Sequence, residues 1–140
     1  MKDAELSDEQ RARLEEALAR VPYARLLGLE LVAAGPGAAT FRLETREELT
    51  RMEGIMHGGA VVSLADTAAA FAVLTLLGPG QRTVTVDLTV HFLRPVQDGE
   101  IRARARVIRE GRRLVIISVE VTDGAGDLAA TVTTTYVKQG

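Results

Sequence analysis

The sequence predicts an α+β domain in which an antiparallel sheet of five to six strands wraps around one long central helix, with a further helix at the N-terminus. The central helix is indicated by the run from Gly58 to Leu77, twenty residues whose single charged side chain is Asp66. A helix that is apolar on every face must be surrounded by other elements. The sheet is indicated by repeated alternation of apolar and polar residues and by regularly spaced glycine-containing turns. One helix and one curved sheet are therefore the layers of the predicted domain.

The N-terminal helix is predicted from about Ser7 to Arg20. Ser7 and Gln10 have the spacing of a capping box, and the apolar residues that follow recur at helical spacing until Pro22. Residues 1–22 are therefore expected to be a helical extension of a single domain that spans residues 1–140.

Strands are predicted on both sides of the central helix. Before it, the apolar stretch from Leu26 to Val32 and the alternating residues 39–43 flank the turn Gly35-Pro36-Gly37. After it, alternation predicts strands over residues 83–92, 101–107, 117–121 and 128–138. The turns between these four strands are typical of a meander in which each strand pairs with the next, and they lie at Asp98-Gly99, Glu110-Gly111 and Asp123-Gly124.

Composition and the N-terminal residues limit the function. The chain of 140 residues has no Cys, no Trp and a formal net charge of -2, which excludes disulfides and argues against a nucleic-acid partner. The charged N-terminus lacks the apolar segment of a secretory signal, so a cytoplasmic location is expected. Although the run from Gly58 to Leu77 is long enough to span a membrane, its small residues and Asp66 favour a buried helix instead. Neither the two histidines nor the three serines have the spacing of a zinc or serine-hydrolase motif, so no metal or cofactor is expected.

The start of the central helix is the first candidate for chemistry. Gly58 and Gly59 follow His57, and two glycines at a helix start leave backbone N–H groups uncovered, where a carbonyl oxygen or an oxyanion can bind. The same glycines are also explained by a tight turn or by close packing of the helix on the sheet. His57 can likewise be a hydrogen-bonded structural residue.

Asp66 is the strongest candidate. It is the only Asp, Glu, Lys or Arg between Glu53 and Arg82, and an Asp within an apolar helix is unfavourable both in propensity and in desolvation. One explanation is that Asp66 caps a helix beginning at Thr67. The other is a carboxylate in a poorly solvated cleft, acting as general base or nucleophile. Gly58 and Asp66 are eight residues apart, roughly 12 Å along a helix, so one substrate can use both groups only if they come from two copies of the chain.

Three segments of the sequence resemble a known family: GIMHGGAVVSLADTAAAFA, TVDLTVHFLRP and EGRRLVIISVEVTDGAGDLAATVTTTYV. They are similar to the hotdog-fold acyl-CoA thioesterases, in particular the PaaI-like branch associated with phenylacetate breakdown. The resemblance covers about residues 25–138 and implies a homodimer or a dimer of dimers with acyl-CoA as substrate. It implies that the Gly58 N–H forms the oxyanion hole, that Gly59 next to it contributes to substrate binding, and that His57 orients the carbonyl or the thiolate. It also implies that Asp66 acts on water or as nucleophile, while Thr85 matches a position where a hydroxyl holds the lytic water.

One position departs from that family. Six residues before the His the family usually has Asn or Gln, and this chain has Arg51. An Arg offers only donors and brings a positive charge toward the carboxylate, which predicts an altered site or an Arg51 that points away. Because coenzyme A carries phosphates, further arginines are expected at the mouth of the site, although each can equally guard a solvated strand edge. The candidates are Arg94, Arg109, Arg112 and Arg113.

Two classes of function remain open at this point. The first is an acyl-CoA thioester hydrolase with its active site shared across a dimer. The second is an acyl-CoA-binding or sensing protein without catalysis, which is favoured by Arg51 at the position where the family usually has Asn or Gln. A hydratase of the same fold is less consistent with the spacing between His57 and Asp66.

Overall fold

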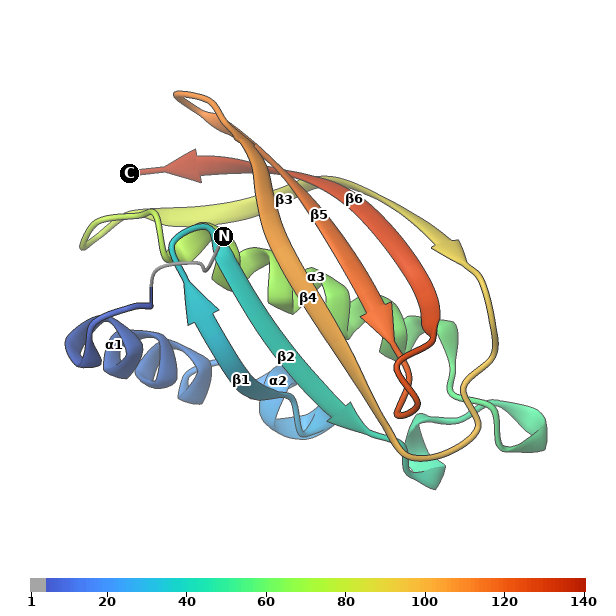
Figure 1. Cartoon of the computed structure of the whole chain (residues 1–140). Helices are drawn as coiled ribbons and strands as arrows, with labels where there is room; N and C mark the ends of the chain where they lie inside the picture. Colours follow the sequence, from blue (N-terminus) through green and yellow to red (C-terminus); the bar gives the residue numbers. More distant parts are fainter. Residues whose placement is uncertain (1–4) are drawn as a thin grey trace.

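The computed structural model describes residues 5–140 and confirms the predicted α+β hotdog architecture. A six-stranded antiparallel sheet in the order β1-β2-β4-β5-β6-β3 curves around the long helix α3 (Figure 1). The strands are β1 (Glu30–Gly35), β2 (Ala38–Glu44), β3 (Arg82–Phe92), β4 (Glu100–Glu110), β5 (Leu114–Thr122) and β6 (Leu128–Gln139). The helices are α1 (Asp8–Ala19), α2 (Pro22–Leu27) and α3 (Gly58–Leu74), and two short 3-10 turns, η1 (Glu47–Leu49) and η2 (Met52–Gly54), precede α3.

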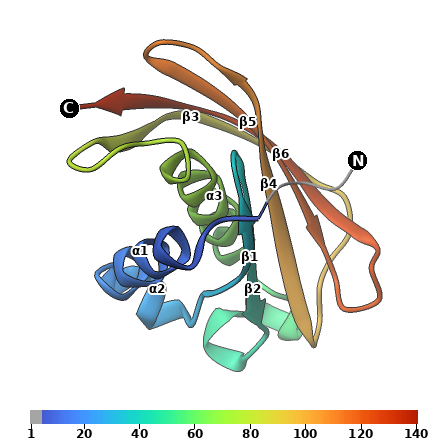
Figure 2. The same cartoon turned by 60° about the vertical axis from the view of Figure 1, so that its left-hand side comes forward.

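The N-terminal helix forms as predicted, although a second short helix follows it. The Ser7 side chain accepts from the N–H of Gln10 at 3.1 Å, and the Gln10 side chain accepts from the N–H of Ser7 at 2.9 Å. The strand expected from Leu26 is wrong at its start, because Pro22 opens α2 and Gly28 ends it in the left-handed conformation. Strand β1 therefore begins only at Glu30. Both α1 and α2 lie on the side of the sheet that faces α3 (Figure 2).

The core lies between α3 and the concave face of the sheet. Alternate residues of each central strand point toward the helix, and within this layer the rings of Phe41 and Phe71 meet edge to face at 5.1 Å. The many alanines of α3 let the helix approach the strands closely, and Ala65, Ala68, Ala69 and Ala72 are fully buried. No helix among residues 5–140 is long and apolar enough to cross a membrane.

The predicted meander holds for β4, β5 and β6 but is wrong for β3. Strand β3 pairs with β6 at the edge of the sheet, so the segment around Asp98-Gly99 is a crossover from one part of the sheet to another instead of a hairpin. At each of the three connections an acidic residue is followed by Gly, but the connection between β3 and β4 spans residues 93–99 and is longer than the loops 111–113 and 123–127 of the two hairpins. As a result β3 is an edge strand with one unpaired side.

One side of α3 is not covered by the sheet. Its half-buried residues recur at helical spacing and lie at Val62, Ser63, Asp66, Thr67, Ala70 and Leu74. The expectation that the helix is surrounded on every face is therefore only partly met within one chain. Asp66 is on this uncovered side.

Candidate active site

Asp66 lies in the middle of an unbroken helix. Helix α3 runs from Gly58 to Leu74 with His57 as its N-cap, so the alternative in which Asp66 caps a helix starting at Thr67 is wrong. Propensity and desolvation both disfavour the residue at this position, and its neighbours must supply the compensation.

Two side chains from the edge of the sheet bind the same oxygen of Asp66. The Thr85 hydroxyl on β3 donates to Asp66 Oδ1 at 3.1 Å, and the Tyr136 hydroxyl on β6 donates to Oδ1 as well. Tyr136 also lies 2.7 Å from the main-chain oxygen of Asp66. Within residues 5–140, no donor binds Oδ2. One carboxylate oxygen is therefore held, and the other is free to contact a substrate or a water.

Tyr136 is a site residue that the sequence analysis missed. Its side chain is 2% exposed, and it stands directly opposite Thr85 in the pairing of β3 with β6. Burial, with the hydrogen bond to Asp66 as a further cause, raises the pKa of Tyr136, so the hydroxyl remains a donor. The sequence did contain a signal, because Tyr136 alternates with Val132 and Thr134 on the inward face of β6. A buried tyrosine hydroxyl needs a polar partner, and Asp66 is that partner.

A β-bulge brings Thr85 to Asp66. The register of β3 on β6 shifts between Thr85 and Asp87, which leaves Val86 as an extra residue. Strict alternation would put Thr85 on the face opposite Leu88, but with the bulge Thr85 and Leu88 both face α3. The proximity of Thr85 to Asp66 agrees with the expected site. Because the hydroxyl proton is directed to the carboxylate, only the lone pairs of Thr85 remain for a water, and that role stays a prediction.

The two glycines at the start of α3 have different roles. The N–H of Gly59 donates to Nδ1 of His57 at 2.8 Å, so the expectation of two uncovered N–H groups is wrong. The N–H of Gly58 donates to no acceptor within residues 5–140 and is free for a substrate oxygen. The binding role predicted for Gly59 itself remains a prediction. His57 has this structural role at Nδ1. Its Nε2 has no partner within residues 5–140 and carries the ring proton when the neutral ring accepts at Nδ1.

Close packing explains why both residues are glycine. A Cβ on Gly59 would come within 2.9 Å of His57 Nδ1, and a Cβ on Gly58 would come within 3.2 Å of the Phe92 ring. Phe92 and Gly58 together line a pocket of about 420 Å³ at the N-terminal end of α3. Its walls are largely apolar, with Met56, Val61, Leu93 and Val96 among the lining residues.

Two of the predicted arginines line this pocket. Arg51 is one of its lining residues, and its side chain has no ion-pair or hydrogen-bond partner among the residues that the structure describes. Arg94 also lines the pocket and is paired with Asp127 at 2.7 Å. The binding role of Arg51 and the alternative in which it points away both remain predictions.

The other predicted arginines are elsewhere in the chain. Arg112 and Arg113 lie in the β4–β5 hairpin and Arg109 lies just before it, at the end of the sheet opposite the N-terminus of α3 (Figure 1). In a single chain they therefore contact neither the pocket nor Asp66. Their predicted binding of coenzyme A remains a prediction that needs a second copy of the chain.

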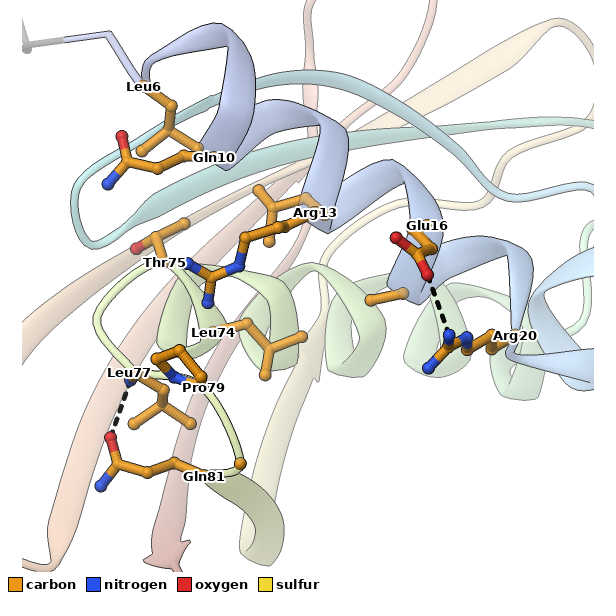
Figure 3. A pocket seen from close by; sticks show the side chains of 14 residues that line it. Leu6, Gln10, Arg13, Glu16, Arg20, Leu74, Thr75, Leu77, Pro79 and Gln81 are labelled. Carbon is orange, nitrogen blue, oxygen red and sulfur yellow. Dashed lines mark hydrogen bonds and ion pairs between the residues drawn. The ribbon is translucent and has the colours of Figure 1, made fainter.

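A second pocket lies at the other end of α3. It has a volume of about 360 Å³ and is formed by α1 and the segment that follows α3 (Figure 3). Arg13 reaches into it from α1, facing Leu74 and Pro79. None of the predicted site residues lines this pocket. In residues 5–140 no group of three or more His, Asp or Glu side chains is placed to hold a metal ion.

The fold defines a hotdog protein. Within residues 5–140, its helix α3 carries a carboxylate oxygen that accepts from no donor and an N-terminal N–H that has no acceptor, two groups of the kind that hydrolysis of a carbonyl compound requires. The family model described as the thioesterase superfamily matches residues 53–130, more than half of the chain. Human acyl-coenzyme A thioesterase 13 is 33% identical over 105 residues, which cover 74% of this chain and 74% of the human protein. The chain belongs to the thioesterase superfamily.

Solved structures agree with this assignment. A variant of the phenylacetic acid degradation protein PaaI from Thermus thermophilus is 33% identical, with a TM-score of 0.76, and the match covers 83% of this chain and 97% of that one. A thioesterase family protein from Silicibacter pomeroyi is 26% identical, with a TM-score of 0.88, and the match covers 92% of this chain and 97% of that one. The predicted thioesterase class and the resemblance to the PaaI-like branch are confirmed.

Proposed function

We propose that this protein hydrolyses acyl-CoA thioesters to the free acid and coenzyme A, with Asp66 as the catalytic carboxylate and the Gly58 N–H as the oxyanion donor. The observation that carries the proposal is the hydrogen bonding of Asp66. Thr85 and Tyr136 bind Oδ1, and no donor within residues 5–140 binds Oδ2.

In the proposed reaction Asp66 is the general base. Oδ2 takes a proton from water, and the hydroxide adds to the thioester carbonyl. The Gly58 N–H stabilises the negative charge on the carbonyl oxygen. When the C–S bond breaks, the thiolate of coenzyme A receives the proton from Asp66.

The alternative is Asp66 as nucleophile. Oδ2 then adds to the carbonyl, the thiolate leaves, and water hydrolyses the acyl-aspartyl anhydride. A single turnover in ¹⁸O water identifies the nucleophilic route if water attacks the aspartyl carbon, because that attack leaves one label in the Asp66 carboxylate. Attack at the acyl carbon leaves Asp66 unlabelled, as the general-base route does, so trapping of the anhydride with hydroxylamine distinguishes these two cases.

We propose that each site is shared between two copies of the chain. Gly58 and Asp66 are eight residues apart on one straight helix, roughly 12 Å along its axis. One thioester carbonyl cannot reach both groups of the same helix. A two-fold axis that brings the partner subunit's Gly58 to Asp66 would make two identical sites per dimer, and a dimer of dimers would contain four.

Strand β3 supports this assembly. It is eleven residues long, lies at the sheet edge, and exposes Val84 by 48% and Val86 by 56%. An exposed apolar edge of that length is a template for pairing with another strand. Pairing of β3 with its symmetry mate would place the uncovered sides of the two α3 helices near each other.

For the acyl group we propose a hydrophobic acid, with phenylacetyl and other aryl thioesters as the first candidates. The pocket beside Gly58 is largely apolar and has a volume of about 420 Å³, within the range of small-molecule sites. The relative from Thermus thermophilus is named for phenylacetic acid degradation, which supports the same choice. Arg51 and Arg94 also line this pocket, and we propose that their charges face its mouth, toward the coenzyme A part of the ester.

The test is release of free thiol from a panel of phenylacetyl, benzoyl, medium-chain and short-chain acyl-CoAs. Turnover is expected for at least one aryl or medium-chain ester, and it is expected to disappear in Asp66→Asn, which preserves the shape of the side chain. Full activity in Asp66→Asn would disprove the mechanism. Saturable binding of the esters without any turnover would instead support the second candidate, an acyl-CoA-binding protein. The favouring observation is Arg51, which lines the pocket and whose side chain has no partner within residues 5–140.

A further inference from the structure

Tyr136 has one hydroxyl proton and two acceptors on the same residue. It lies 2.7 Å from the main-chain oxygen of Asp66 and within hydrogen-bond distance of Oδ1. A phenol donates one hydrogen bond. The proton therefore serves one of these oxygens at a time, and the charge on Asp66 decides which of them it serves.

The preference changes with the protonation state of Asp66. When the carboxylate is ionised, Oδ1 is the stronger acceptor, because charge-assisted hydrogen bonds are about twice as strong as neutral ones. When Oδ2 has taken a proton, Oδ1 and the main-chain oxygen are both neutral acceptors, and the phenol proton can turn to the main chain. In both states the buried hydroxyl keeps a partner, so neither state leaves an unsatisfied polar group.

We propose that Tyr136 is the positioning residue of the hydrolysis: it fixes Oδ1, assigns proton transfer to Oδ2, and moves its own hydrogen bond between Oδ1 and the main-chain oxygen as Asp66 gains and loses a proton. The inference rests on the proposed role of Asp66 as base. Before the first step, the hydrogen bond from Tyr136 to Oδ1 keeps Asp66 ionised, so that the carboxylate can accept a proton from water. In the last step the returning hydrogen bond to Oδ1 favours release of that proton to the thiolate.

Within residues 5–140, the side chains that donate to Asp66 are those of Tyr136 and Thr85. Helix α3 carries no other charged residue, and the residues next to Tyr136 on the inward face of β5 and β6 are Val115 and Thr134. The nearest acidic residue along β3 is Asp87, whose side chain is on the exposed part of the strand. Thr134 donates to the main-chain oxygen of Asp87 at 2.7 Å and is not available to Asp66.

The first test compares Tyr136→Phe with the parent enzyme. We expect kcat to fall about tenfold or more with KM within about twofold, because the lost group acts through Asp66 and not on substrate binding. The acidic limb of the pH–rate profile is expected to move to higher pH, because the ionised carboxylate loses a donor. An unchanged kcat and profile would overturn the proposal, and so would a lower kcat without any movement of the acidic limb.

Two parallel variants separate this inference from the proposed function. Tyr23→Phe removes a hydroxyl that is 2.8 Å from Ser63 on the same helix as Asp66, and it is expected to retain the parent kcat and profile. Asp66→Asn is expected to be inactive. Full activity in Asp66→Asn would reject the proposed function itself, whereas an inactive Asp66→Asn together with a fully active Tyr136→Phe would reject only the role of Tyr136.

A spectroscopic measurement does not depend on the stability of Tyr136→Phe. The chain has two tyrosines, so the Tyr23→Phe chain labelled with 3-fluorotyrosine carries a single fluorine, at residue 136. Its ¹⁹F signal is expected to move with pH at the midpoint of the acidic limb, and the step is expected to be lost in Asp66→Asn. A signal that shows no step at that midpoint would overturn the proposal.

Discussion

The Nδ1 atom of His57 accepts a hydrogen bond from the N–H of Gly59 at 2.8 Å, so the histidine caps the helix that carries Asp66. The bond occupies one of the N–H groups at the start of α3 and leaves the N–H of Gly58 free. It also places the exchangeable proton of the neutral ring on Nε2. A single side chain therefore caps the helix and determines which of the two glycine N–H groups has no acceptor within residues 5–140.

Replacement of His57 is expected to separate these two roles. His57→Ala removes the cap and is expected to lower the free energy of unfolding by about 1 kcal/mol, whereas His57→Asn retains an oxygen acceptor and most of the stability. Both variants lose Nε2 and are expected to lose activity. Urea unfolding and thiol-release assays on the two variants check this, and an active His57→Asn would restrict His57 to the structural role.

The oxyanion role of Gly58 can be tested without disrupting the helix. Gly58→Pro deletes the N–H at the first helical position, where proline is well tolerated, and the extended conformation of His57 suits a following proline. We expect kcat to fall about 10²-fold to 10³-fold. Gly58→Ala is the matched control, because it retains the N–H and adds the same Cβ contact with Phe92. Equal losses in the two variants would assign the effect to Phe92.

The shared site predicts complementation between two inactive variants. In a mixture of Gly58→Pro and Asp66→Asn subunits, half of the dimers are mixed and each mixed dimer has one native site of two, so about a quarter of the parent activity is expected. Co-purified, differently tagged subunits and a thiol-release assay measure it. If both groups acted within one chain, mixing would restore no activity.

The edge strand β3 provides a test of assembly. Val84→Lys places a charge on the exposed edge and is expected to give a folded monomer without hydrolase activity. Ile108→Lys is the control, because Ile108 is 58% exposed on the interior strand β4 and its replacement leaves the β3 edge unchanged. Light scattering with size-exclusion chromatography gives the mass of each variant. A fully active Val84→Lys monomer would contradict the two-chain site.

Tyr136 predicts a loss of stability at alkaline pH. Its pKa is raised in the folded chain, mainly by burial, so the folded state keeps the phenol neutral while the unfolded chain ionises above about pH 10. The stabilisation is therefore complete below that pH and decreases as pH rises. Tyr136→Phe is expected to remove this part of the alkaline destabilisation, and urea unfolding at several pH values measures it.

The alkaline prediction has an optical control. Tyr136 is buried and its pKa is raised, so Tyr23→Phe, which retains Tyr136 as its one tyrosine, is expected to show no tyrosinate absorbance until it unfolds. Tyrosinate absorbance from folded Tyr23→Phe would contradict the assignment.

Arg51 is expected to bind the charged part of the substrate. It lines the pocket beside Gly58, and its side chain has no partner in residues 5–140. Arg51→Gln is expected to raise KM for an acyl-CoA about fivefold, which corresponds to about 1 kcal/mol for a surface ionic contact. The same acyl group on N-acetylcysteamine carries no phosphate, and its KM is expected to stay unchanged. A KM that rises equally for both esters would place Arg51 at the acyl group.

The sequence was sufficient to predict the elements whose pattern is local. The cap at Ser7, the turn at Gly37, the long helix and the isolated carboxylate Asp66 are all readable within a few residues. The partner of β3 was not, because the turn residues at Asp98-Gly99 match those of a hairpin and the choice between hairpin and crossover depends on packing around α3. The bulge at Val86 was also hidden, since nothing in the alternation of β3 marks the extra residue.

Only the part of the site that local sequence patterns mark could be predicted. Asp66, Gly58 and His57 stand out because their residue types are unusual where they occur. Tyr136 contacts Asp66 across seventy residues of sequence, and only the folded sheet shows the pairing. The roles of Gly58 and Gly59 could be distinguished only once the ring of His57 was seen to accept from one of the two N–H groups.

The bulge at Val86 has a consequence for how this strand can change in evolution. Before the bulge the odd-numbered residues of β3, such as Thr85, face α3, and after it the even-numbered residues, such as Leu88, do so. Thr85 therefore reaches Asp66 only if the extra residue is retained. Substitutions on the outer side of β3 leave this geometry intact. Loss or gain of a single residue between Thr85 and Leu88 would turn the hydroxyl away from the carboxylate while the strand itself could still form, so the length of this segment is under tighter constraint than its composition.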